Sequence, residues 1–236
     1  MVMAARTATI TEGQRELRAQ TLKDSSKTAA NQQLILQNWF SPAFPIGSFS
    51  YSAGLETAIA NGTVGNRQDL QSWLSMVLHH GAAQTDAVIV AAAFSGEAVN
   101  DLCLSLCAGA ERHLETSELG RAFTAVVNDT YGLGLVDGLA YPVAVGMAGS
   151  ALGLDRNQLV CAFLQSWCAN QISVAVRTIP IGQLDGQQCL VALMPEIETA
   201  VDLAMATPSD EIGSFSIAVE LASLEHETAE QRIYRT

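Results

Sequence analysis

The stretch from residue 38 to residue 62 restricts the fold of this chain more than any other part of the sequence. Pro42 and Pro45 fix the backbone angle φ and favour extended conformations at the residues before them, while Gly47 allows conformations that other residues avoid. Aromatic side chains crowd the same region: Phe40, Phe44, Phe49 and Tyr51. Most connecting segments are polar and solvated. We therefore predict a rigid apolar turn that is either buried under the fold or exposed to bind a partner.

Elsewhere, apolar residues recur with the period of an α-helix. Asn66 is a residue type that caps helices, and the residues after it at helical spacing are Leu70, Trp73, Leu74, Val77 and Leu78. This pattern predicts an amphipathic helix that ends near Gly81. The run from 85 to 106 is nearly uncharged and rich in alanine, which predicts a helix buried on most sides, with a break near residues 95–96.

Two further helices are marked by their first residues. Tyr141-Pro142 opens a run of small residues, and the glycines in it would let another helix approach closely. Asp155 is followed three residues later by Gln158, a pair that resembles a capping box, and an apolar face then runs to about residue 176. Pro180 is predicted to end this second helix.

The C-terminal third is harder to interpret. Residues 181–187 are predicted to form a turn because they contain Asp185-Gly186. Pro195 either kinks the next helix or begins a new one at its first position. Residues 212–222 are expected to form the last helix, and the charged residues that follow are expected to be a solvated tail.

No part of the sequence shows a convincing strand series, so the predicted fold class is all-α: a single-domain helical bundle of about eight helical segments. Residues 1–30 are polar and are expected to be a disordered or frayed extension. Residues 31–236 are predicted to form the helical domain, with a tail at about 225–236.

Composition restricts the kinds of partner. Hydrophobic residues make up 49% of the chain and charged residues 15%, yet no run approaches the roughly 18 apolar residues that span a membrane. The surplus apolar surface predicts an oligomer or a component of a complex. From residue 31 onward there are seven basic and 21 acidic residues, a formal charge of −14 that disfavours nucleic acid and would attract a basic protein.

The five cysteines are odd in number and lie in apolar surroundings, which favours a reducing, cytoplasmic compartment. Their spacings are not those of zinc sites, so they are expected to act as small buried hydrophobic residues. His79 and His80 are adjacent and cannot readily chelate one ion on a helix. His226 has no second histidine four residues on, where a zinc protease would need one. We predict no catalytic group, no metal site and no cofactor.

Several short blocks, in order, resemble the urease accessory protein UreF family. The first is residues 41–56, and the others are 117–121, 141–143, 179–187, 213–215, 226–227 and 232–235. The resemblance covers residues 33 to 236. Ala53 stands where the family often has a histidine, which weakens any metal-binding or catalytic role for this stretch.

This resemblance implies an all-helical, homodimeric, cytoplasmic protein that is not an enzyme. Such a protein helps to insert nickel into apo-urease by bridging a UreD-type accessory protein and a UreG-type GTPase. Two regions of the family face these partners, and carried onto this sequence they give the predicted partner-binding residues: Phe44, Pro45, Gly47, Ser48, Phe49, Ser50, Tyr51, Ser52, Gly54, Leu55, Glu56, Arg232, Tyr234 and Arg235. Apolar anchors, tyrosine and arginine are residue types enriched at binding hot spots.

Two alternatives remain at this point. A metallochaperone would carry nickel itself through His79, His80 or the cysteines. An enzyme or ligand-binding bundle would hold an apolar site between its helices, where such pockets do form.

Overall fold

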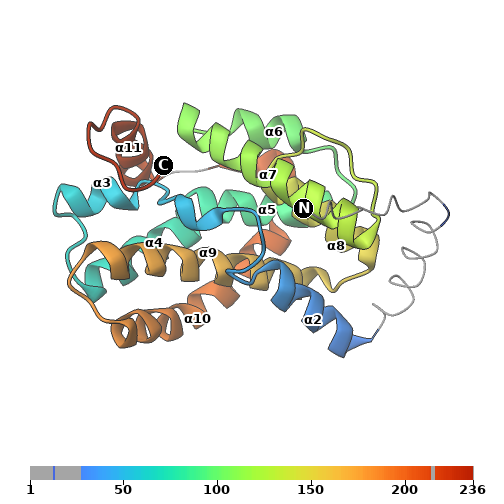
Figure 1. The fold of residues 1–236 in the computed structure, drawn as a ribbon, viewed down its shortest axis with the longest axis horizontal. Helices are drawn as coiled ribbons and strands as arrows, with labels where there is room; N and C mark the ends of the chain where they lie inside the picture. The colour runs from blue at the N-terminus through green and yellow to red at the C-terminus, as the bar shows by residue number, and fades with distance from the viewer. Residues whose placement is uncertain (1–12, 14–27, 214–215, 236) are drawn as a thin grey trace, which may run out of the picture.

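The computed structural model describes residue 13, residues 28–213 and residues 216–235. Within these ranges every regular element is helical, which confirms the all-α prediction (Figure 1). The expectation for residues 1–30 falls mostly outside the described residues. Buried apolar side chains from α2 to α11, together with Tyr234 near the C-terminus, form one continuous core.

The helix α5 (Ala82–Phe94) lies at the centre of the bundle. Residues 83 to 93 are all buried, as the apolar run predicted. Packed against α5 are α4 (Arg67–His80), α8 (Tyr141–Leu152), α9 (Arg156–Thr178) and α10 (Gln183–Ala206). After a break at residues 95–99, the chain resumes as the short α6 (Asn100–Ser105) and then the long α7 (Ala110–Tyr131).

Small residues bring α8 against α5, as the sequence predicted. A Cβ atom added at Gly146 would lie 2.5 Å from the carbonyl oxygen of Val90, closer than real Cβ contacts come. Only glycine fits at this crossing without moving a backbone. This close contact fixes the position of α8, and α7 packs on α8 in turn.

Both predicted helix caps are present. The side chain of Asn66 accepts hydrogen bonds from the backbone nitrogens of Gln68 at 2.8 Å and Asp69 at 3.1 Å. The side chain of Asp155 accepts one from the backbone nitrogen of Gln158 at 2.8 Å. These contacts satisfy donors at the first turn that no residue within the helix can reach.

The predicted turn at residues 181–187 is wrong over most of its length, because α10 begins at Gln183. Asp185 accepts a hydrogen bond from the backbone nitrogen of Gly182 at 3.2 Å and so caps the helix instead of ending one. Pro195 lies inside α10, which continues through it to Ala206, so it does not begin a second helix.

The helix α9 is long and apolar enough to cross a membrane by length and composition. Half of the relevant stretch is buried inside the bundle, and α9 packs against α10, α5, α3 and α4. These contacts are those of a core helix. A core helix can be as long and as apolar as a membrane-spanning helix.

The last helix, α11 (Ile217–His226), begins five residues later than predicted, after the short 3₁₀ helix η2 (Ser209–Glu211). Residues 227–235 follow it and are called the C-terminal segment below. The expectation of a solvated tail holds for residues 228, 230–233 and 235, which are exposed. It is wrong for His226 and Tyr234, which are 1% and 6% exposed. The segment returns to α3 (Leu55–Ala60) and α7 at the end of the bundle where α11 lies (Figure 1).

Candidate partner-binding site

The apolar turn predicted from the prolines and glycines connects α2 (Ala29–Trp39) to α3. Gly47 has φ +78° and precedes the 3₁₀ helix η1 (Ser48–Ser50), which packs against α9. Asn170 on α9 donates a hydrogen bond from its side chain to the carbonyl of Ser48 at 2.9 Å. The stretch is therefore folded onto the bundle and its backbone is held in place.

Gly54 directly precedes α3 and lets α11 approach the start of that helix. Its φ is +79°, and a Cβ atom there would lie 2.9 Å from the backbone nitrogen of Ser223. Both the left-handed conformation and the close approach require glycine at this position. Gly54 thus determines how closely the end of the apolar turn and the last helix are packed.

The aromatic residues of the stretch divide between core and surface. Phe44 is buried and its ring lies 5.6 Å from that of Phe123. Tyr51 is buried too, whereas the side chain of Phe49 is 59% exposed. The sequence left open whether these rings are buried in the core or exposed to a partner. Phe44 and Tyr51 are buried, and Phe49 is exposed.

The carboxylate of Glu56 joins this stretch to the C-terminal segment. One oxygen accepts a hydrogen bond from the backbone nitrogen of Ile233 at 2.7 Å. The other accepts from the backbone nitrogen of Tyr234 at 3.0 Å and lies 3.1 Å from Nε2 of His226. Two regions that the family resemblance had pointed to separately are therefore brought together by one side chain.

A second set of contacts connects Tyr51, Glu118 and Arg235. The Tyr51 hydroxyl donates to Oε2 of Glu118 at 2.8 Å, and the guanidinium of Arg235 lies 2.7 Å from the same oxygen. Arg235 also lies over the Tyr51 ring, 5.5 Å from its centre, and donates its backbone N–H to the carbonyl of Ser50 at 2.8 Å. Hydrogen bonds from Tyr51 and Arg235 lower the pKa of Glu118, while burial is the main cause that raises the pKa of Tyr51.

The remaining two predicted residues of the tail also contact the bundle. Arg232 pairs with Glu111 on α7 at 2.6 Å, and its side chain is 41% exposed. The ring of Tyr234 is buried beneath the guanidinium of Arg177, 5.5 Å from the ring centre.

The fourteen predicted residues thus lie in one region, but not all of them reach its surface. The buried ones are Phe44, Tyr51, Ser52, Gly54, Leu55 and Tyr234, and the partly buried ones are Gly47, Ser48, Ser50 and Glu56. The exposed ones are Pro45, Phe49, Arg232 and Arg235.

The acidic residues that hold the C-terminal segment were not among the residues predicted from the sequence. Glu111 and Glu118 are two turns apart on α7, where residues seven positions apart share a face. Arg232 and Arg235 pair with them in the same order. Two glutamates on one face of α7 and two arginines in the tail can be read from the sequence. Their pairing becomes apparent only once α7 and the tail are known to be neighbours.

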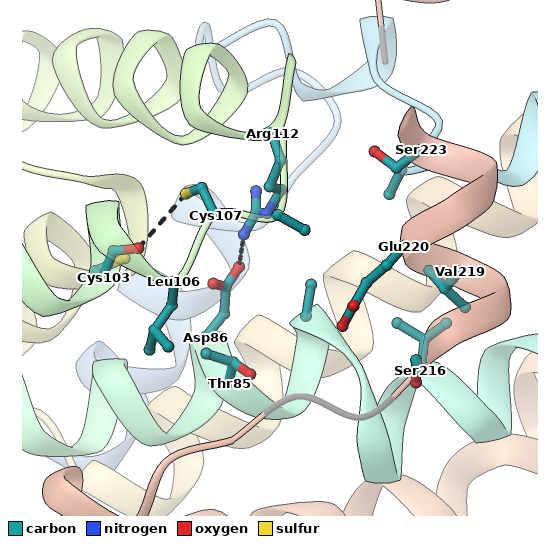
Figure 2. A pocket seen from close by; sticks show the side chains of 14 residues that line it. Thr85, Asp86, Cys103, Leu106, Cys107, Arg112, Ser216, Val219, Glu220 and Ser223 are labelled. Atoms are coloured by element: carbon teal, nitrogen blue, oxygen red, sulfur yellow. Dashed lines mark hydrogen bonds and ion pairs between the residues drawn. The ribbon is translucent and has the colours of Figure 1, made fainter. Parts of the chain in front are cut away.

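A buried ion cluster lies beneath the site and was also missed. Arg112 forms an ion pair with Asp86, and its guanidinium lies 3.1 Å from Glu115 without hydrogen-bond geometry. Figure 2 shows Asp86 and Arg112 pointing toward each other at the edge of a cavity, with Glu220 entering from α11. This cavity has a volume of about 60 Å³. Burial raises the pKa values of Asp86 and Glu115, an effect that Arg112 opposes.

A larger cavity, of about 270 Å³, lies between the apolar turn and helices α7 and α9. Ser48 and Phe49 line it on one side and Arg112 and Glu115 on the other. The ion cluster therefore borders both cavities. The one sign of this ion cluster in the sequence was Asp86, an isolated aspartate in the apolar run 82–94.

The described residues contain no group of three or more histidine, cysteine, aspartate or glutamate side chains arranged to hold a metal ion. His79 lies 3.4 Å from Glu196 and is not part of such a group. Burial raises the pKa of all five cysteines, so they favour the thiol over the reactive thiolate.

Fold and site together describe an all-helical protein in which an N-terminal turn and the C-terminal segment form one joint surface. The UreF family model matches residues 64–194. Among similar proteins, the urease accessory protein UreF of Dinoroseobacter shibae is 42% identical over 207 residues, which cover 86% of this chain and 98% of the relative. The UreF protein of Cereibacter sphaeroides strain KD131 is 43% identical over 206 residues, which cover 86% of this chain and 98% of the relative. The UreF protein of Methylobacterium sp. strain 4-46 is 39% identical over 220 residues, which cover 86% of this chain and 88% of the relative. The chain belongs to the UreF family, and the resemblance found in the sequence is confirmed.

Substitutions in the buried ion cluster are expected to change the free energy of unfolding. Arg112→Met should lower the free energy of unfolding by about 3 kcal/mol, because two buried carboxyl groups then lose their only cation in the cluster. Glu115→Gln should be neutral or stabilising at pH 8, because the pair of Asp86 and Arg112 remains. Urea unfolding measures both, with Arg121→Met, an exposed arginine on the same helix, as the control.

The pH dependence follows from the same cluster. Burial raises the pKa of Glu115 in the folded state, so the folded state binds its proton more tightly than the unfolded state does. The stability that this group contributes is present at low pH and is lost as the pH rises above the ordinary carboxyl range of about 4. The wild type should therefore lose stability relative to Glu115→Gln between pH 4 and pH 8. A constant difference, or an Arg112→Met variant as stable as the control, would contradict this description of the cluster.

Proposed function

We propose that the chain is a urease maturation factor that helps to insert nickel into apo-urease. In this role it binds a UreD-type accessory protein and a UreG-type GTPase at the same time, so that the metal is delivered where the urease can receive it. Membership of the UreF family supports the general role, since the relatives are named as urease accessory proteins.

The observation that carries this proposal is the joint surface of the N-terminal turn and the C-terminal segment. Phe49 and Ile233 are 59% and 76% exposed. The side chain of Arg235, two residues after Ile233, is 52% exposed. Exposed apolar groups beside arginines are typical of binding hot spots. In the proposal, Pro45, Phe49, Arg232 and Arg235 contact a partner directly.

The buried members of the predicted set have a different proposed role. Phe44, Leu55 and Tyr234 anchor the two segments to the bundle, and Ser52 accepts a hydrogen bond from the backbone of Glu56 at 3.4 Å. These residues keep the surface in a single shape before any partner arrives. Preorganisation of this kind lowers the entropy cost of binding.

The mechanism proposed is positioning without catalysis. GTP hydrolysis belongs to the GTPase partner, nickel is cargo, and this chain contributes binding energy that places the two partners next to each other. The formal charge of −14 from residue 31 onward favours basic partner surfaces over nucleic acid or anionic membranes.

We further propose that the chain acts in the cytoplasm as a homodimer. Its support is an apolar outer face of α10, where Leu184, Val191 and Met194 lie on one side of the helix and are 71%, 59% and 47% exposed. A second copy would cover this face. Light scattering of the isolated chain should give about twice the monomer mass of 25.0 kDa, and a monomer at micromolar concentration would contradict the homodimer.

A pull-down with the UreD-type protein and the UreG-type GTPase tests the proposed function. The wild type should recover both, and Phe49→Ser should weaken recovery by at least about tenfold if the ring is a hot spot. Val136→Ser is the matched control, because Val136 is also exposed, at 63%, but lies in the loop between α7 and α8. Recovery of neither partner by the wild type would refute the scaffolding role. Equal recovery by both variants would show that the turn does not bind.

Arg232→Ala is expected to abolish the complex while the helices remain folded. Truncation after Glu225 is a poorer experiment, because it removes the buried side chains of His226 and Tyr234. The substitution removes one ion pair, between a half-exposed Arg232 and a largely buried Glu111, and leaves His226 and Tyr234 in place.

A further inference from the structure

The larger cavity connects the surface at the apolar turn with the buried ion cluster. Pro42 and Phe49 line it and are exposed. Asp86, Glu115 and Gln171 line it too, but they are only 6%, 6% and 2% exposed. The cavity therefore has its mouth at the turn and its floor at the ion cluster.

The floor of the cavity carries more negative than positive charge. Arg112 is the only cation among the described residues that line it, and it pairs with Asp86. One oxygen of Glu115 lies 3.1 Å from the same guanidinium but has no hydrogen-bond partner among the described residues. Two carboxylates thus share one cation. Because a buried carboxylate without a hydrogen bond is costly, the floor favours a second cation.

The walls of the cavity suit a planar cation. Cations are attracted to the faces of aromatic rings, and arginine is found there more often than lysine because its flat guanidinium stacks on the ring. A guanidinium can also donate two hydrogen bonds to one carboxylate. Six aromatic side chains line the cavity: Trp39, Phe40, Phe49, Tyr141, Phe163 and Trp167.

Size and position favour a side chain of a partner protein over a free ligand. The volume of about 270 Å³ lies below the roughly 300 Å³ at which small-molecule pockets usually begin. Phe49, at the mouth, is one of the exposed residues proposed above to contact a partner. The formal charge of −14 from residue 31 onward also attracts basic protein surfaces.

We propose that the larger cavity receives an arginine side chain of a protein partner. The arginine enters beside Phe49 when the partner docks on the turn, and its guanidinium pairs with Glu115 between the aromatic walls. The inference rests on the proposed function, because it names the chemistry that one of the partners presents to the joint surface. The cavity itself can be tested on the isolated chain.

Nitrogen-15 NMR of the full chain, titrated with Nα-acetylarginine methylamide, tests the cavity. The chain has three tryptophans. The indole signals of Trp39 and Trp167, which line the cavity, should shift, whereas that of Trp73 on α4 should not. Nα-acetylcitrulline methylamide has the same shape without the charge. It should bind at least about tenfold more weakly, the difference between a charge-assisted and a neutral hydrogen bond.

Glu115→Gln should abolish the preference for arginine over citrulline, because it removes the carboxylate and keeps the shape of the side chain. Asp129→Asn, at an exposed position on the same helix, is the matched control and should keep the wild-type preference. In the pull-down, Glu115→Gln should lower recovery of the partner that supplies the arginine by about tenfold. The citrulline comparison uses the wild type alone, so it decides even if the variant fails to fold.

Three results would each overturn the proposal: no shift of Trp39 and Trp167, equal binding of the two amides, or wild-type selectivity in Glu115→Gln. Binding of the arginine amide with unchanged recovery of both partners by Glu115→Gln would also overturn it, because the cavity would then take a free guanidinium compound. That last result would leave the proposed function intact. Recovery of neither partner by the wild type would instead refute the proposed function, and the titration would show separately whether the cavity binds a guanidinium.

Discussion

The carboxylate of Glu56 is the contact on which the candidate site depends. It lies at the start of α3, directly after the apolar turn, and accepts hydrogen bonds from backbone atoms 177 and 178 residues further along the chain. A carboxylate that accepts several N–H groups is a strong, directional anchor. Without it, the turn and the C-terminal segment would be two separate surface features.

The bundle makes this contact possible. Close packing of α8 against α5 positions α7, and α7 presents Glu111 and Glu118 toward the C-terminal segment. Gly54 lets α11 approach α3, so that the chain emerges from α11 within reach of Glu56. Small residues in the core and at the end of the turn therefore decide where the charged residues meet.

Features set by local chemistry could be predicted from the sequence. Asn66 and Asp155 cap the helices they were expected to cap, and the uncharged run around α5 is buried as its composition indicated. The Asp185-Gly186 pair led to the wrong prediction of a turn at residues 181–187, because the same pair is common in turns. In the structure Asp185 caps α10, and Gly186 is packed so tightly that a Cβ would lie 2.9 Å from the side chain of Ile172.

The arrangement of the site could not be predicted in the same way. The residues after Glu225 are charged, and local composition favours a solvated tail. Their partners, Glu56, Glu111 and Glu118, are more than 100 residues away, so only the tertiary structure brings the charges together. The resemblance to a family pointed to the two segments but not to the contact between them.

The central claim is that Glu56 holds the C-terminal segment against the N-terminal turn. The most direct measurement is the rate at which trypsin cleaves after Arg232 in Glu56→Ala, compared with the wild type and with Glu198→Ala, an exposed glutamate on α10. Because proteases cut segments that detach, loss of the anchor should speed cleavage by about tenfold or more while the control matches the wild type. Cleavage at the wild-type rate in Glu56→Ala would contradict the claim.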